Sequence, residues 1–308
     1  MRASIHAGEL EIAVSAARGA SEELVCDSLA YHLRRVIRPL GEIVVRTDTQ
    51  VSRNDVEGTK RHADGTLYFN YPFGRGRLTA DGLAKITVLP KARALDAALV
   101  FVMTEMTKLR GARVAQARGI LMGDSVHVVL GRGANRLCQQ ATDLGMPILQ
   151  SAALMFYSVA ASWEVTELPS ALLARPVRAG VVAAWWHVEE TDGAELSIAP
   201  CHPSETAGAL LQLALGLHQT KSDKEALLDA VVSVAAQGAT GRLDLPTAAV
   251  PTIDLAASAE ALLLRRQLAP DPSPRLAFGQ TSGGIDLGGF PETFKAKGSR
   301  RRTPKPAG

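Results

Sequence analysis

The chain has 308 residues, of which 46% are hydrophobic, 21% charged and only 5% aromatic, and its net charge is +3. This length and composition are ordinary for a soluble globular protein with a well-buried core. Residues 269–308 hold seven Lys/Arg against three Asp/Glu, so this segment carries +4 and the rest of the chain −1. A uniformly basic surface, the usual footprint of a strong nucleic-acid binder, is therefore excluded, and any basic site in the body must be local.

The three cysteines, Cys26, Cys138 and Cys201, lie far apart and form no CxxC pair. This usage favours a reducing cytosol over a disulfide framework. The start of the sequence has no apolar segment of the signal-peptide kind, and the apolar runs are shorter than the roughly 20 residues that span a bilayer. We therefore expect a cytoplasmic protein without a membrane segment.

The opening of the chain predicts a β-α-β unit. Residues 4–14 alternate partly between apolar and polar and indicate a strand. Ser21 and the two acids after it are typical of a helix N-terminus, and Pro39 and Gly41 predict where that helix ends. The β-branched residues of 42–51 then predict a second strand.

The next segment predicts a polar loop or hairpin arm over 52–65, with a tight turn at Asp64-Gly65. Strands follow at 66–71 and 83–89. Residues 91–109 are apolar all round at their centre, which favours a buried helix, although 97–103 alone would also suit a core strand. The pattern of 112–118 indicates that helix continues after Gly111.

A second unit of alternating strands and helices follows. It comprises a strand at 125–130, a helix at 134–144 capped by Gly145, a strand at 147–149 and an apolar helix at 151–161. Alternation of this kind predicts some parallel strand pairing.

The C-terminal part predicts a hairpin and then helices. The hairpin pairs 181–189 with 194–199 around Thr191-Asp192-Gly193. Helices are predicted at 204–218, 222–237 and 255–268. The fold class is mixed α/β, with a mixed sheet containing βαβ units and a helical C-terminal part. We divide the chain into an α/β domain (1–165), a hairpin-plus-helical region that could belong to the same domain (166–268), and a disordered basic tail (269–308).

The least random stretch of the sequence is 66–78, where four aromatic residues fall within six positions and a Gly-Arg-Gly-Arg loop follows. Exposed aromatic rings stack on unpaired bases, and arginines hold phosphates. Glycines would let the backbone approach a phosphate closely. The competing interpretation is an edge strand with its rings in the core and a solvated basic turn. The candidate nucleic-acid-binding residues are Lys60, Arg61, Tyr68, Tyr71, Phe73, Arg75 and Arg77.

A second candidate is the turn Gly131-Arg132-Gly133 between a strand and a helix. Backbone N–H groups at a helix N-terminus attract anions, so these three residues could bind a phosphate. The turn lacks the third glycine of a dinucleotide motif and the Gly-Lys-Ser/Thr of a P-loop, so an ordinary strand-to-helix turn explains it equally well.

Other polar residues make weaker candidates. The cluster Asp48, Asn54, Asp55, Glu57, Lys60 and His62 could hold Mg²⁺, but its spacing matches no motif and favours a solvated hairpin arm. Cys201-His202 lacks an orienting third group, so we interpret His202 as a surface or capping residue. His127 lies in an apolar strand and is interpreted as a core histidine. We identify no catalytic residue, metal site or cofactor motif.

Two functional hypotheses follow. The first is a non-catalytic protein that binds single-stranded RNA or DNA, assisted by its basic tail and working as a subunit of a larger ribonucleoprotein or DNA-processing assembly. The alternative is an α/β enzyme or ligand-binding protein that acts on a phosphorylated small molecule or nucleotide at Gly131–Gly133. A third possibility is a scaffold protein that uses the Trp185-Trp186 hairpin as a contact surface.

Overall fold

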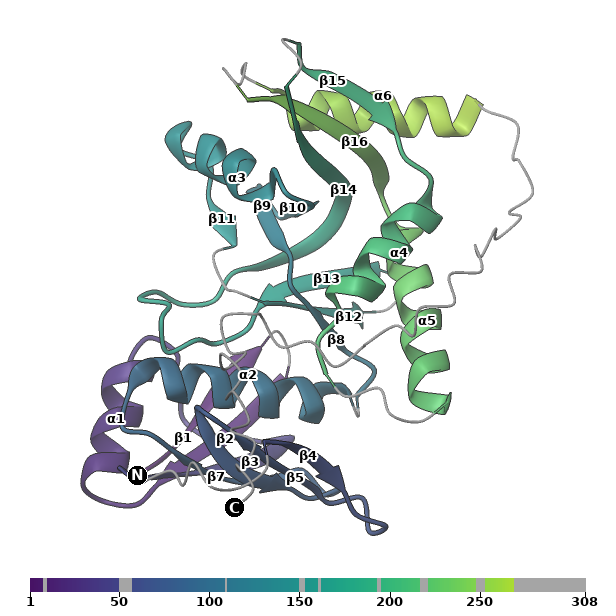
Figure 1. The fold of residues 1–308 in the computed structure, drawn as a ribbon. Helices are drawn as coiled ribbons and strands as arrows, with labels where there is room; N and C mark the ends of the chain where they lie inside the picture. Colours follow the sequence, from purple (N-terminus) through teal and green to yellow (C-terminus); the bar gives the residue numbers. More distant parts are fainter. Residues whose placement is uncertain are drawn as a thin grey trace, which may run out of the picture.

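The computed structural model shows two mixed β-sheets and six helices within the residues it describes (Figure 1). The mixed α/β prediction is therefore confirmed. None of the helices in this described part is long and apolar enough to cross a membrane. The described residues are 1–7, 10–49, 57–108, 110–149, 153–159, 162–192, 195–216, 221–247 and 253–268, with the backbone alone from 265.

The first sheet has seven strands in the order β1-β2-β3-β7-β6-β5-β4. β2, β3 and β7 run parallel to one another, and the remaining neighbours are antiparallel. Its strands are β1 (Arg2–Ala7), β2 (Leu10–Ala16), β3 (Gly41–Thr47), β4 (Gly58–Arg61), β5 (Leu67–Tyr71), β6 (Gly74–Leu78) and β7 (Leu83–Val88).

Two helices pack on one face of this sheet. α1 (Ala20–Leu29) joins β2 to β3 and completes the predicted β-α-β unit, although it ends well before Pro39. α2 (Ala92–Lys108) follows β7 and matches the helix predicted at 91–109. Because α2 lies on the side of the sheet that faces the rest of the chain, the opposite face points away from the molecule (Figure 1).

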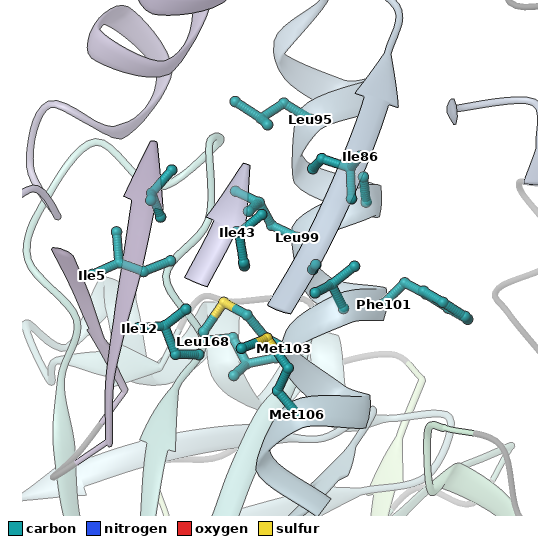
Figure 2. Close-up of a cluster of buried hydrophobic side chains, with 14 of the residues drawn as sticks. Ile5, Ile12, Ile43, Ile86, Leu95, Leu99, Phe101, Met103, Met106 and Leu168 are labelled. Atoms are coloured by element: carbon teal, nitrogen blue, oxygen red, sulfur yellow. The ribbon is translucent and has the colours of Figure 1, made fainter. Parts of the chain in front are cut away.

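The core of this half forms between α2 and the sheet. Leu95, Leu99 and Met106 on α2 are fully or almost fully buried, and they share one cluster with Ile43 of β3 (Figure 2). Leu168, which comes directly after the second-sheet strand Ser162–Glu167, belongs to the same cluster. This cluster therefore joins the two halves of the structure.

The second sheet has nine strands, and its main path runs β11-β9-β10-β14-β13-β12-β8. β16 (Ala239–Pro246) pairs with β14 in parallel and with β15 in antiparallel orientation. β10 and β14 are also parallel. The other strands are β8 (Arg113–Ala115), β9 (Arg118–Met122), β10 (Ser125–Leu130), β11 (Ile148–Leu149), β12 (Leu154–Val159), β13 (Ser162–Glu167), β14 (Ala179–Thr191) and β15 (Ser197–Pro200).

Helices cover both faces of the second sheet. α4 (Pro203–Leu213) and α5 (Lys221–Ala235) pack on one face, and α3 (Ala134–Asp143) and α6 (Leu255–Leu268) pack on the other. Trp185 and Trp186 are adjacent in β14, so they point to opposite faces, and each is fully buried in a different core. The tryptophan doublet is therefore core rather than the contact surface of the scaffold hypothesis.

The structure corrects several predicted elements. The single strand predicted at 4–14 is the antiparallel pair β1 and β2. The helices predicted at 112–118 and 151–161 are the strands β8 and β12. A short apolar run in a sheet covered on both faces lacks alternation and resembles a buried helix. The predicted hairpin does not form either, because β16 pairs with both β14 and β15 and separates them.

The predicted domain limit at 165 falls inside β13, and both sides of it belong to the same sheet. The two sheets instead divide between β7 and β8, on either side of α2. The predicted tail, 269–308, lies outside the described residues.

Candidate functional site

Strand alternation gives the first sheet two different faces. Leu67 and Phe69 of β5 and Leu78 of β6 point inward and are buried, whereas Tyr68 and Arg77 between them are exposed. We call the side turned away from α2 the outer face. On the five strands β4, β5, β6, β7 and β3, its residues are Glu42, Val44, Arg46, Gly58, Lys60, Tyr68, Asn70, Arg75, Arg77, Leu83, Lys85 and Thr87.

The strand register arranges most of these residues in two rows that cross the strands. The first ladder, in order from β4 to β3, is Lys60, Tyr68, Arg77, Lys85 and Val44. The second ladder, in the same order, is Gly58, Asn70, Arg75, Thr87 and Arg46. Directly opposite residues on neighbouring strands have Cβ atoms about 5 Å apart, so members of a ladder are in contact range.

The outer face forms an open groove with a volume of about 830 Å³. Lys60, Tyr68, Arg75, Arg77 and Lys85 line it, together with other members of the ladders. Tyr68 is 41% exposed, which leaves its ring available for stacking. The ring of His62 lies at a centroid distance of 4.8 Å from the Tyr68 ring and supports it.

Positive charge dominates the groove. Five cations line it, while Glu57 is its one carboxylate among the described lining residues. Arg75 forms an ion pair with Asp48 at 3.8 Å between Nη2 and Oδ2, and both side chains are solvated. Exposed pairs of this kind are weak. The remaining four cations, Arg46, Lys60, Arg77 and Lys85, form no ion pair with a residue that the structure describes.

The candidate residues of the sequence analysis fall on two sides of the sheet. Lys60, Tyr68, Arg75 and Arg77 lie together on the outer face.

The other three candidates lie elsewhere. Arg61 alternates to the inner side, where its Nη2 lies 3.3 Å from Oε2 of the buried Glu105 on α2. Phe73 is only 4% exposed, and Tyr71 is half-buried with its ring 5.3 Å from that of Phe73. Burial raises the pKa of Tyr71. These three residues support the fold beneath the outer face.

The predicted Gly-Arg loop is the strand β6. Gly76 points inward opposite Phe69, and a Cβ at this position would lie 2.7 Å from the Phe69 ring atom Cζ. The glycines therefore make room for core groups, and the arginines between them point outward. This replaces our interpretation that the glycines admit a phosphate.

The outer face includes two cations that the sequence analysis did not select, Arg46 and Lys85. Each occupies an outward position in a strand that was itself predicted. The available signal was the alternation of 42–51 and 83–89. Local patterns did not provide the strand order, in which β7 lies beside β6 and β3 lies beside β7.

The turn Gly131-Arg132-Gly133 is explained by packing against β14. Gly131 has φ of +94°, and a Cβ there would overlap the Val188 carbonyl group. The Gly133 N–H donates to the Val188 carbonyl oxygen at 3.0 Å. The Gly133 N–H, which a phosphate at this turn would need as a donor, is therefore already bonded to β14.

The two histidine interpretations are confirmed. His127 is buried, and its Nδ1 accepts a hydrogen bond from Trp186 Nε1 at 3.1 Å. Burial lowers the pKa of His127 to about 4, so its ring is neutral at pH 7. His202 caps α4 by accepting the Ser204 N–H at 3.2 Å.

The other weak candidates gain no support. Burial raises the pKa of Cys201 to about 12, which keeps its thiol protonated at neutral pH. Asn54 and Asp55 of the polar cluster lie outside the described residues. Among the described residues, no three His, Cys, Asp or Glu side chains are grouped so that they could hold a metal ion.

Comparisons with known proteins identify no relative by sequence. No family model matches the chain, and no curated protein matches it. One solved structure with partial similarity is the Hpr(Ser) kinase/phosphatase from Coxiella burnetii, at 11% identity and a TM-score of 0.26, over 50% of this chain and 90% of that chain. Similarity at this level supports no conclusion about function.

Proposed function

We propose that the outer face of the first sheet binds single-stranded nucleic acid, RNA or DNA. The observation that supports this function is the arrangement of five cations around the exposed ring of Tyr68 in one open groove. Sheet faces that combine stacking rings with cations bind unpaired bases and their phosphates.

The proposal treats this face as a binding surface and assigns it no catalytic step. Arginine and lysine attract phosphates whatever the sequence of the strand, and an aromatic ring stacks on any base. Affinity should therefore depend strongly on salt and weakly on base identity. The tail beyond residue 268 carries further cations, so it would add to the affinity of the full chain.

The test compares two variants of the full-length chain that lose the same charge. Arg75→Ala with Arg77→Ala removes two cations from the outer face. Arg35→Ala with Arg38→Ala removes two exposed cations that follow α1. Because the tail is unchanged in both, the difference between them reports on the groove.

We expect the first variant to bind a fluorescently labelled single strand about tenfold more weakly at about 0.1 M salt, from two lost contacts of up to about 1 kcal/mol each. The control variant should bind within about twofold of the wild type. Fluorescence anisotropy measures both affinities. Equal losses in the two variants, or no binding by the wild type, would refute the function.

A further inference from the structure

We propose that a bound single strand crosses the outer face perpendicular to the β-strands, from β4 to β3, with one base stacked on Tyr68. This inference rests on the proposed function and adds a path, a footprint and two further contact residues, Arg46 and Lys85. The path is inferred from the register of the five strands and from the positions, at either end of the ladders, of the last cations that form no ion pair with a described residue.

The area of the outer face that the five cations cover, which we call the cationic field, is longer across the strands than along them. Lys60, Arg77 and Lys85 share the first ladder, and Arg75 and Arg46 share the second. Five strands about 4.8 Å apart span about 19 Å. Along a single strand, the outward pair Arg75 and Arg77 covers only about 7 Å. A linear polyanion gains the most contacts when it lies along the ladders.

Both ends of this field are defined by the sheet. β4 is the edge strand in the described sheet, so the ladders begin there. On the other side, the first ladder continues past Val44 to Ser15 and Arg2, but the charge of Arg2 is compensated by Glu42 at 3.6 Å. Ser15 also donates to Glu42, at 2.7 Å. The unbalanced positive charge therefore ends at β3.

Tyr68 provides the stacking position on this path. It stands in the first ladder between Lys60 and Arg77, so a base on its ring would have a cation on either side for the adjoining phosphates. Bases inside a duplex are already stacked on one another and cannot use the ring without being unpaired. The geometry therefore favours a single strand over a duplex.

The length of the field sets the footprint. Phosphates of a stacked strand rise about 3.4 Å each, so about 19 Å accommodates about six nucleotides, and fewer if the strand is extended. With five cations in contact, the logarithm of the binding constant should fall with the logarithm of the salt concentration with a slope of about −3.5 from this face.

The first test uses single variants of the full-length chain. We expect Arg46→Ala and Lys85→Ala each to weaken binding of a six-thymidine strand about two- to fivefold and to reduce the salt slope by about 0.7. Arg35→Ala is the control, because it removes an exposed cation outside the ladders, and it should change neither quantity. Tyr68→Leu should cost about tenfold through lost stacking, and Tyr68→Phe should restore most of it.

The second test maps the path. The same strand carries a photoreactive thymine at either its 5′ or its 3′ end, and cross-linked peptides are identified by mass spectrometry. We expect one end to label β4 or β5 and the other end to label β3. Labels from both ends on one β-strand would overturn the transverse path.

The outcomes separate this inference from the function on which it rests. If Arg75→Ala with Arg77→Ala weakens binding while Arg46→Ala and Lys85→Ala do not, the function stands and the path is refuted. A duplex that binds as tightly as the single strand overturns the stacking role of Tyr68. An acidic polypeptide that displaces the strand at equal charge concentration would show a site for acidic proteins and overturn both.

Discussion

The two sheets of this protein differ in how far helices cover them, and therefore in how their polar residues are used. The second sheet is covered by helices on both faces, its strand β10 is mostly buried, and β14 is buried at its centre around Trp185 and Trp186. Among the described residues, helices cover the first sheet on one face only, and β5, β6 and β7 alternate between buried and exposed residues. On the outer side of β1 and β2, Ser4 and Glu11 are buried and hydrogen-bond to the segment after α1. The outer face of β5, β6 and β7 is thus not fixed by packing against a described helix.

Two buried polar groups of the second sheet illustrate matching within the chain. Glu167 is fully buried, and its carboxylate accepts hydrogen bonds from the Arg175 guanidinium at 2.7 and 2.8 Å. His127 accepts from Trp186. On the outer face, by contrast, cations stand opposite one another, as with Arg77 and Lys85. Like charges placed opposite each other destabilise a sheet, and the polyanion of the proposed function would compensate them.

The first prediction concerns the buried polar groups of the second sheet. It tests how the stability of the protein depends on the protonation of His127. Burial lowers the pKa of His127 from 6.5 to about 4. The unfolded chain therefore binds this proton more readily than the folded chain does, and the stability from the neutral ring is complete above pH 6.5. It is lost as the pH falls from 6.5 to about 4, by about 3 kcal/mol in total.

Urea unfolding at several pH values between 7 and 4 measures this loss. In His127→Gln the amide oxygen can still accept from Trp186, but the group no longer titrates, so the decline between pH 6.5 and 4 should be shallower by about 3 kcal/mol. His202→Gln, at the exposed cap of α4, should keep the wild-type decline. Parallel profiles for wild type and His127→Gln would contradict the buried neutral ring.

The difference in helix cover between the two sheets also explains which elements could be predicted from the sequence. The helices at 91–109, 134–144 and 255–268 were predicted because their length and period favour helix. β5 and β7 were predicted because one exposed face forces alternation. Of the missed strands, β8, β9, β12, β13 and β16 lie in the second sheet, where helices cover both faces and the alternation is weak. The strand β6 of the first sheet was missed because its glycines and arginines are typical of a loop.

The residues of the candidate site also divide into those that local patterns could group and those that they could not. Lys60, Tyr68, Arg75 and Arg77 could be grouped from the sequence because β4, β5 and β6 are consecutive hairpin partners. Arg46 could not, because β3 reaches β7 through parallel pairing across 35 intervening residues that include the β4–β6 hairpins. Local patterns carry no record of that order. Phe73 was selected wrongly, because alternation places it on the same side as Phe69, and both rings are buried in one cluster.

The second prediction tests whether the glycines of β6 serve the core. In Gly76→Ala the new Cβ would lie 2.5 Å from the Lys85 carbonyl oxygen and 2.7 Å from Phe69 Cζ, so the sheet or the ring must move. We expect a loss of about 1–3 kcal/mol in the free energy of unfolding. Urea unfolding at pH 7 provides the measurement.

Gly208→Ala in α4 is the matched control. A Cβ at Gly208 meets no heavy atom within 4 Å, and alanine is the better helix former by about 0.5–1 kcal/mol. We expect this variant to be more stable than the wild type. If Gly76→Ala is equally well tolerated, the glycines of β6 are not required by packing, and close approach by a ligand becomes the better explanation for them.

The third prediction has the smallest effect on stability and bears most directly on the outer face. Lys85 lies opposite Arg77 across β6 and β7, so replacing it with the strand-favouring residue threonine removes a like-charge pair. We expect Lys85→Thr to raise the free energy of unfolding by about 0.2–0.5 kcal/mol at low salt. The gain should shrink as salt screens the repulsion in the wild type.

Lys60→Thr separates this effect from a general benefit of threonine. Lys60 lies opposite Tyr68 rather than a cation, so its replacement relieves no repulsion and should bring no such gain. Both variants should nevertheless bind a single strand more weakly, because each removes a cation from the groove. A residue whose removal stabilises the fold and weakens binding is retained for its ligand. If Lys85→Thr destabilises the protein instead, the cations of the outer face belong to the fold, and the difference between the two sheets says nothing about function.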